Sequence, residues 1–254
     1  MEQSRKIFIG GNWKSNGDLQ FVKDHVAFLN SIAFDNEKCE VSVSPVFIHL
    51  PAVISSLDSR YIVSAQNVSL FDNGAYTGEI SAKQLKDLGI NWTLIGHSER
   101  RQYFGENEEV VGRKVKIALE NGLNVIACIG EKLSDREAGH TVEVVSTQMK
   151  TLVSSIVDWS RVVIAYEPVW AIGTGVTATP QQAQEIHNEI RKILASSVSE
   201  DVANKVRIIY GGSVTEKNAE ELIRQPDIDG FLVGGASLKS GFKTIIESYK
   251  FKNN

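Results

Sequence analysis

Eight short runs of β-branched and other apolar residues, each followed by a stretch of helical periodicity, constrain the fold of this chain most strongly. Runs of this length without polar alternation are typical of strands buried on both faces. Strict alternation of such strands with helices predicts a parallel sheet. The predicted strands are Ile7–Gly11, Glu40–Ser44, Tyr61–Ala65, Trp92–Ile95, Asn124–Ile129, Arg161–Tyr166, Val206–Tyr210 and Gly230–Val233.

The segments between these strands carry apolar residues at helical spacing and recognisable helix starts. Thr179 and Gln182 have the spacing of a capping box around Pro180, and Ser81 and Gln84 repeat it. Two apolar helix faces are predicted, one through Leu19, Val22, Val26 and Leu29 and one through Ala183, Ile186, Ile190 and Leu194. Buried strands and one-sided helices are the parts of a layered α/β fold.

Eight units without a break in composition favour closure of the sheet into a (β/α)8 barrel. We expect one domain over residues 1–254, because a barrel of this kind typically needs about 250 residues. Hydrophobic residues make up 42% and charged residues 23% of the chain, which is ordinary for a globular protein. A doubly wound open sheet of the same strands is the alternative architecture.

Charge and the lack of targeting signals argue against several classes of function. The formal net charge is -4, so non-specific nucleic-acid binding is not expected, and local groups would have to hold an anionic ligand. No apolar run approaches the roughly 20 residues of a membrane helix, and Met1–Lys6 lacks the apolar core of a signal peptide. Cys39 and Cys128 show no spacing typical of a metal site or a disulfide framework. We therefore expect a cytoplasmic protein without a membrane or nucleic-acid partner.

The segment that begins at Arg161 gives the strongest indication of chemistry. Its apolar run ends in Glu167, Pro168 follows at once, and Gly173 and Gly175 come soon after. Parallel barrels place their chemistry at the carboxyl ends of their strands, and a proline restricts the residue before it to extended conformations. A carboxylate beside a glycine-bearing cover suggests a general base that works in a closed, dry pocket.

Polar side chains follow other predicted strands and would meet at the same rim of a barrel. Asn12 and Lys14 follow the first strand, and His97 follows the fourth. Lys14, His97 and Glu167 would then face a common pocket, although they are far apart in the sequence.

Glycine pairs follow the last two predicted strands, at Gly211-Gly212-Ser213 and Gly234-Gly235. Backbone N–H groups can cradle a phosphate only where no side chain blocks the approach. Barrels often carry a phosphate site after strands seven and eight. Two such pairs after adjacent strands therefore predict a phosphate-binding site.

Five segments together resemble the triosephosphate isomerase family, in the order that the family has them and over nearly the whole chain. They are Gly10–Lys14, Gly96–Arg101, Ala165–Gly175, Tyr210–Ser213 and Val233–Leu238. Members of that family share the barrel fold and interconvert dihydroxyacetone phosphate and D-glyceraldehyde 3-phosphate in glycolysis and gluconeogenesis. They use no metal or cofactor and usually act as homodimers, and the resemblance implies the same for this chain.

The resemblance implies catalytic roles for four residues. Glu167 would be the base that moves a proton between two substrate carbons through an enediolate. His97 would be a neutral electrophile that donates a hydrogen bond to the developing oxyanion. Lys14 would be the fixed cation that attracts the phosphate and the developing charge, and Asn12 would hydrogen-bond the substrate.

The resemblance also implies how the substrate phosphate is held. Backbone N–H groups of Gly173, Ser213, Gly234 and Gly235 would bind its oxygens. The segment 168–176 would close over the substrate as a lid, so that binding the phosphate through Gly173 and excluding water become one event.

Two residues that follow His97 are expected to support it. Ser98 and Glu99 lie where a helix N-terminus is predicted, and its positive end would disfavour a charged imidazole. Glu99 is interpreted either as the partner that holds Lys14 or as a member of a salt bridge at the rim, and the sequence does not choose between them.

Three residues are expected to act around the site and not in it. Tyr210 would brace the lid through its hydroxyl, and Trp170 would anchor the lid at its first hinge. Thr77 lies in the segment Asn73–Glu79, which resembles the loop that enters the neighbouring subunit near Asn12 and Lys14 in the family's dimers.

The sequence departs from the family pattern at two positions near these segments. Val176 stands where many members carry a lysine at the second lid hinge, and we expect altered lid rates at most. Ser15 stands where bulkier residues are common, and a small polar group there could loosen the dimer. Cys128 and the remaining histidines match no motif and are interpreted as packing or surface residues; the histidines are His25, His49, His140 and His187.

Two other functions are alternatives to the isomerase. A different phosphate-binding barrel enzyme, such as a sugar-phosphate epimerase or an amino-acid biosynthetic isomerase, would share the glycine pairs but would not need the segment Glu167–Trp170. A non-catalytic protein that keeps the fold would have lost Lys14, His97 or Glu167, and all three are present.

Overall fold

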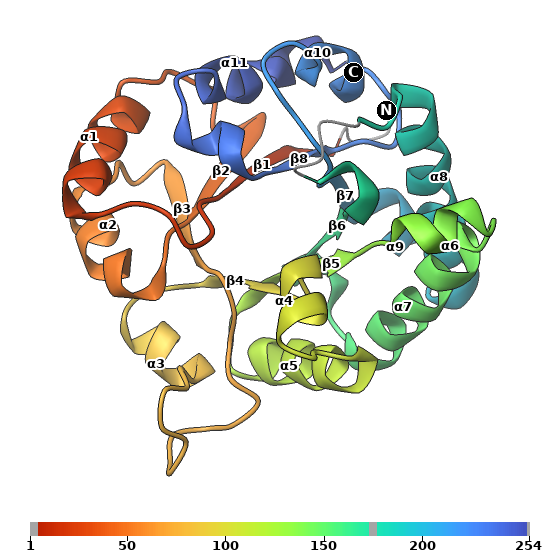
Figure 1. The fold of residues 1–254 in the computed structure, drawn as a ribbon, viewed down its shortest axis with the longest axis horizontal. Helices are drawn as coiled ribbons and strands as arrows, with labels where there is room; N and C mark the ends of the chain where they lie inside the picture. The colour runs from red at the N-terminus through yellow and green to blue at the C-terminus, as the bar shows by residue number, and fades with distance from the viewer. Residues whose placement is uncertain (1–4, 173–176, 253–254) are drawn as a thin grey trace.

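Eight parallel strands pair in chain order and close into a barrel, since β1 also pairs with β8. The computed structural model describes residues 5–172 and 177–252, and Figure 1 shows the strands as a central ring inside a ring of helices. The strands are β1 Ile7–Asn12, β2 Cys39–Ser44, β3 Tyr61–Ala65, β4 Trp92–Ile95, β5 Asn124–Ile129, β6 Val162–Tyr166, β7 Arg207–Tyr210 and β8 Gly230–Val233. The predicted (β/α)8 barrel is confirmed, and the ends of each predicted strand match or differ by one residue.

The inside of the barrel is a packed core and not a channel. The side chains that fill it are Phe8, Leu94, Ile126, Cys128, Val163, Ala165, Ile209 and Leu232. A larger apolar layer fills the space between the strands and the helices. Cys128 is completely buried, and burial raises the pKa of its thiol well above the ordinary value, as expected for a packing residue.

The helices cover the outside of the barrel (Figure 1). The α-helices of the described residues are α1 Leu19–Asn30, α2 Leu50–Ser56, α3 Ala82–Asp87, α4 Ser98–Tyr103, α5 Glu108–Glu120, α6 Leu133–Glu137, α7 Thr141–Ser155, α8 Pro180–Ser197, α9 Glu200–Lys205, α10 Ala219–Ile223 and α11 Phe242–Glu247. Short 3-10 helices are η1 Phe47–His49, η2 Trp159–Arg161, η3 Val169–Ala171, η4 Gly235–Leu238 and η5 Ser248–Phe251. Among the described helices, none is both long and apolar enough to cross a bilayer.

The two predicted apolar faces are present with one exception. On α8, the four predicted residues are all buried. On α1, Val22, Val26 and Leu29 are buried, but Leu19 is 60% exposed. Leu19 is the first residue of α1, so the apolar face of this helix begins one turn later than predicted.

Both predicted capping boxes are confirmed and fix where two helices begin. At α8, the Thr179 and Gln182 side chains accept hydrogen bonds from each other's backbone N–H groups at 3.1 and 3.0 Å. At α3, Ser81 and Gln84 make the same pair of contacts at 3.1 and 2.9 Å. These bonds satisfy N–H groups that have no partner within the helix.

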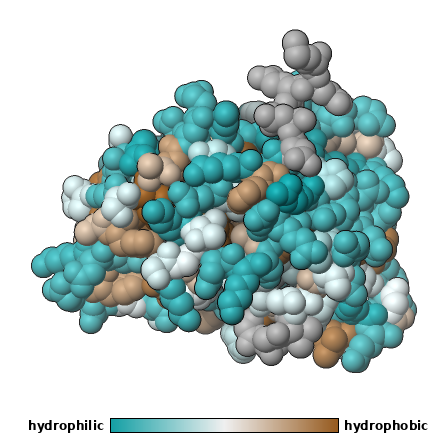
Figure 2. Space-filling view, turned by 90° about the horizontal axis from the view of Figure 1, so that it is seen from above, coloured by the Kyte–Doolittle hydropathy of each residue, from teal (hydrophilic) through white to brown (hydrophobic). Residues whose placement is uncertain are grey.

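The segment between β3 and α3 projects away from the barrel (Figure 1). Two of its aromatic rings, Phe71 and Tyr76, stack on each other with centroids 4.1 Å apart, and both are partly exposed. Elsewhere the face drawn in Figure 2 is mostly hydrophilic, with apolar residues in small groups. The projecting segment is thus an unusual feature of a surface that is otherwise ordinary.

Candidate active site

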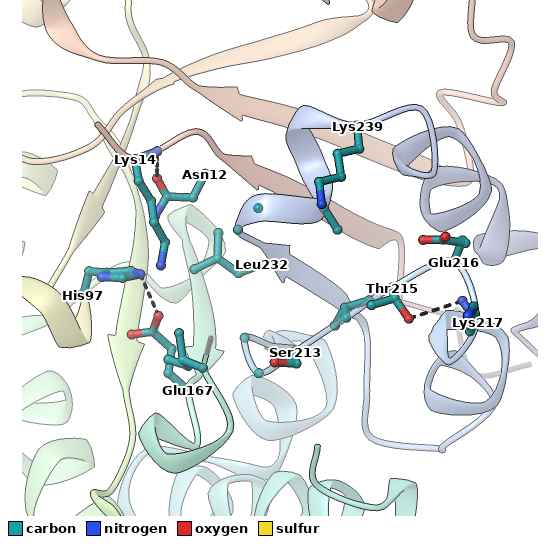
Figure 3. A pocket seen from close by; sticks show the side chains of 17 residues that line it. Asn12, Lys14, His97, Glu167, Ser213, Thr215, Glu216, Lys217, Leu232 and Lys239 are labelled. Carbon is teal, nitrogen blue, oxygen red and sulfur yellow. Dashed lines mark hydrogen bonds and ion pairs between the residues drawn. The ribbon is translucent and has the colours of Figure 1, made fainter. Parts of the chain in front are cut away.

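A cavity of about 500 Å³ opens at the carboxyl ends of the strands, where the sequence predicts the site. Segments that follow five strands line it. They contribute Asn12 and Lys14 at the end of and after β1, His97 after β4, Glu167 and Ile172 after β6, residues 211–217 after β7, and Leu232, residues 234–236 and Lys239 at and after β8. Figure 3 shows the Lys14, His97 and Glu167 side chains directed toward one another across the inner end of this cavity.

Glu167 is held with its carboxylate buried at the inner end of the cavity. Only 2% of the residue is exposed. Its Oε1 lies 2.9 Å from His97 Nε2, and its Oε2 accepts a hydrogen bond from the Ser98 backbone N–H at 3.0 Å. The carboxylate therefore has one donor for each oxygen and is oriented before any substrate arrives.

Two glycines make room for Glu167 between the ends of β5 and β7. A Cβ on Gly130 would lie 1.7 Å from the Glu167 carbonyl oxygen, and a Cβ on Gly211 would lie 2.9 Å from its Cγ. The Glu167 N–H in turn donates to the Ile129 carbonyl at 2.7 Å, which extends the β5–β6 pairing by one step. Any larger residue at Gly130 would push Glu167 away from its present place.

His97 caps the N-terminus of α4 and has a defined tautomer. Its Nδ1 accepts a hydrogen bond from the Glu99 backbone N–H at 3.2 Å, so the proton is assigned to Nε2, which donates to Glu167. Burial is the largest single influence and lowers the pKa of His97, but the Glu167 carboxylate and, to a smaller extent, Glu99 together raise it by more, so the net shift is upward from 6.5. If Glu167 moves away, burial outweighs the remaining influences and favours the neutral ring.

Lys14 is held in a backbone conformation that only glycine adopts easily. Its φ is +54°, and it is the only non-glycine residue with a positive φ in the described part of the chain. The Asn12 side chain accepts from its N–H at 3.0 Å, and Gln66 donates to its carbonyl at 2.7 Å. Its Nζ lies 2.6 Å from Glu99 Oε1, so Glu99 does pair with Lys14. Strain of this kind persists only where the surroundings enforce it, which is typical of functional sites.

At the predicted phosphate end of the site, two glycines line the cavity, and one backbone N–H already donates a hydrogen bond within the protein. Gly234 and Gly235 line the cavity, and a Cβ on Gly235 would meet nothing within 4 Å. The Ser213 N–H and hydroxyl, however, both donate to the Ala171 carbonyl, at 3.1 and 2.6 Å. Ser213 can bind a phosphate through its N–H only after this contact with η3 has broken. The predicted contact from Gly173 lies outside the described residues.

The start of the predicted lid is anchored by a carboxylate that was not among the predicted site residues. Glu131 is completely buried and accepts from Trp170 Nε1 at 2.9 Å and from the Tyr166 hydroxyl at 3.0 Å. The Arg136 guanidinium lies 4.3 Å from the centre of the Trp170 ring. Trp170 is thus fixed at the position of the predicted hinge anchor. The available signal for Glu131 was its place directly after Gly130, at the end of a buried strand.

Tyr210 lies beside the other end of the predicted lid. Burial raises the pKa of its hydroxyl to about 12, and the nearby Ala178 backbone opposes this shift. A Cβ on Gly212 would lie 2.2 Å from the Tyr210 hydroxyl oxygen, so glycine is needed there to admit the ring. Val176, the predicted variable hinge residue, lies outside the described residues.

Three further residues, two of them discussed from the sequence and one not predicted, lie at or outside the edge of the cavity. Thr77 is exposed in the projecting segment and does not line the cavity, and Ser15 is also exposed. Lys239 lines the mouth of the cavity and was not predicted (Figure 3). Within the described residues, no group of three or more His, Cys, Asp or Glu side chains is placed to hold a metal ion.

Together these features define a class of protein. A closed parallel barrel carries a buried carboxylate against an imidazole N–H, a fixed lysine and an open glycine pair in one cavity. Those are the parts of a barrel enzyme that moves a proton on a small phosphorylated substrate.

Comparison with known families makes the class specific. The family model described as triosephosphate isomerase matches residues 7–249. The chain therefore belongs to the triosephosphate isomerase family, as the sequence segments predicted. Its function is the interconversion of dihydroxyacetone phosphate and D-glyceraldehyde 3-phosphate, an aldose–ketose isomerisation of glycolysis.

Proposed function

We propose that Glu167 is the base of this isomerisation and that His97, Lys14 and Asn12 stabilise the charge that develops on the substrate. The observation that carries the proposal is the buried contact of 2.9 Å between Glu167 and His97, in a cavity that Lys14 and Asn12 also line. One carboxylate can reach two adjacent carbons with little motion, and one imidazole can serve the oxygens on both.

The proton balance of the reaction assigns each group a step. Glu167 takes a proton from the carbon next to the substrate carbonyl, while His97 Nε2–H donates a hydrogen bond to the carbonyl oxygen. The resulting enediolate carries its negative charge on an oxygen near His97 and Lys14. The protonated Glu167 then returns the proton to the neighbouring carbon. His97 moves a proton between the two oxygens, and no net proton is gained or lost.

The phosphate group is proposed to bind at the opposite end of the cavity from Glu167. Gly234 and Gly235 offer backbone N–H groups without side-chain obstruction. Ser213 joins them when its contacts with Ala171 break, and Gly173 of the lid completes the set. Release of Ala171 by Ser213 therefore links phosphate binding to movement of η3, the first turn of the lid.

The proposal is tested by a coupled assay with glyceraldehyde 3-phosphate on wild type and Glu167→Asp. The shorter side chain withdraws the base by about one methylene, and such a misplacement lowers kcat by about 100-fold with little change in KM. Glu216→Asp makes the same change at the mouth of the cavity and should turn over normally. A Glu167→Asp enzyme as fast as wild type would exclude Glu167 as the base.

We also propose that the chain forms one domain, acts in the cytoplasm and works as a homodimer. Large apolar side chains are exposed on segments that follow β2, β3 and β4: Ile48 is 82% exposed, and Tyr76, Tyr103 and Phe104 are exposed as well. Apolar groups gathered on one side of a protein typically mark an interface. The projecting segment would bring Thr77 against the loop of the second subunit that carries Lys14, so dimer formation would steady that lysine.

A further inference from the structure

The loop that carries Lys14 is held in place by contacts on its buried side. Lys14 has a strained backbone, and the Asn12 and Gln66 side chains fix only its own N–H and carbonyl. The preceding residue, Trp13, is completely buried and anchors the loop in the body of the protein. Whatever surrounds the Trp13 indole therefore also sets the position of Lys14.

Two rings of α1 surround Trp13. Phe21 meets the indole edge-on at 5.7 Å, and His25 does so at 5.1 Å. Phe21 and His25 stack on each other with centroids 5.0 Å apart and planes 17° apart. Phe21 also packs onto Gly17, where an added Cβ would lie 2.5 Å from the Phe21 ring. The stacked pair thus contacts the loop at both of its ends.

His25 is a buried, neutral ring. Only 6% of the residue is exposed, and burial lowers the pKa of its imidazole. The ring therefore packs on Trp13 and Phe21 as an uncharged aromatic group. Its contact with the Trp13 indole links α1 to the loop that carries Lys14.

We propose that Phe21 and His25 are positioning residues that act through Trp13 to hold Lys14 in place for the substrate. Neither side chain lines the cavity, so both act through other residues. Because Lys14 is proposed both to attract the phosphate and to stabilise the developing charge, loss of the pair raises KM for the triose phosphate, weakens binding of inorganic phosphate and lowers kcat.

Phe28 provides the matched control for a merely structural role. Its ring packs on His25 from the side, with centroids 5.6 Å apart, and makes no ring contact with Trp13. Phe28→Leu removes aromatic packing from the same helix without touching the loop. It should lower the melting temperature and leave the affinity for phosphate unchanged.

The experiment compares His25→Leu, His25→Phe and Phe28→Leu with wild type, well below their melting temperatures. His25→Leu is expected to raise KM and the inhibition constant of inorganic phosphate by about tenfold, within the range that small misplacements cause. It should also lower kcat, because Lys14 is proposed to stabilise the charge that develops on the substrate. His25→Phe keeps the stacked ring and should recover most of the lost affinity.

Two results would overturn the inference. One is a His25→Leu enzyme that binds inorganic phosphate as tightly as wild type. The other is a Phe28→Leu enzyme that loses as much affinity, which would reduce the pair to general packing. The kinetic reading rests on the proposed function, but phosphate binding measured by calorimetry does not. Absence of isomerase activity in wild type would therefore refute the function and leave the positioning test intact.

Discussion

Glu167 shows how the surroundings of one carboxylate prepare it for chemistry. Each of its oxygens has one donor, the imidazole of His97 or the backbone N–H of Ser98. To reach a substrate carbon the carboxylate has to leave the imidazole, and the Nε2–H of His97 is then free for the substrate oxygen. The same movement would remove the main cause that raises the pKa of His97, so the proposed base and the proposed electrophile would become ready together.

His187 should make the stability of the protein depend on pH. It is completely buried on α8, and burial lowers its pKa to about 4, although its Nδ1 faces the Asp227 carbonyl at 3.1 Å. Between pH 6.5 and 4, His187 binds a proton in the unfolded chain but not in the folded chain. The free energy of unfolding therefore falls as the pH falls. From pH 7 to pH 5 this group contributes a loss of about 2 kcal/mol, at about 1.4 kcal/mol per pKa unit.

Urea unfolding at fixed protein concentration measures this dependence. His187→Gln should remove most of the difference in free energy of unfolding between pH 7 and pH 5. If the variant kept the whole difference, the buried neutral state of His187 would not be its source.

Among the strands and helices, the functional residues at the strand ends could be predicted from the sequence. Several residues that hold them in place could not. Glu167, His97 and Lys14 follow buried apolar runs, and the geometry of a parallel barrel then brings them to one rim. Glu131 and Gln66 act through contacts between segments far apart in the sequence, and no local sequence pattern predicts such contacts. The bond between Ser213 and Ala171 also depends on how η3 lies beside β7, which neither segment reveals alone.

The close packing of the ends of β5 and β6 can be tested by a substitution at Gly130. A Cβ on Gly130 would lie 1.7 Å from the Glu167 carbonyl oxygen, so Gly130→Ala must displace the end of β6 together with the base. We expect kcat/KM to fall by about 100-fold, the cost of moving a catalytic group by about 1 Å. The coupled assay measures it, and unchanged turnover would mean that the strand ends adjust without moving the carboxylate.

For the whole molecule, charge limits how an anionic substrate can be held. The net charge is -4, and Lys14 is already paired with Glu99 at 2.6 Å. We therefore expect that attraction for a phosphate depends on backbone N–H groups and on cations at the mouth of the cavity such as Lys239, in addition to Lys14. The sequence predicted this reliance on local groups from composition alone, but it did not identify Lys239.

The proposed dimer can be tested through Ser15. A small polar residue facing the partner's projecting segment should leave the interface loose, so dilution should dissociate the dimer measurably and lower the specific activity with it. Sedimentation velocity over a dilution series measures the dissociation, and Ser15→Met should shift it to lower concentration. A wild-type dimer that stays intact at low nanomolar concentration would show that Ser15 does not weaken the interface.

Glu167 is proposed to carry the proton between two carbons of the substrate. Isomerisation in D2O, followed by mass and NMR analysis of the product, tests it most directly when wild type is compared with Glu167→Gln. Wild type is expected to place deuterium on the carbon that receives the proton. Glu167→Gln should still bind inorganic phosphate but should neither turn over nor incorporate deuterium. Incorporation by Glu167→Gln at the wild-type rate would contradict the assignment.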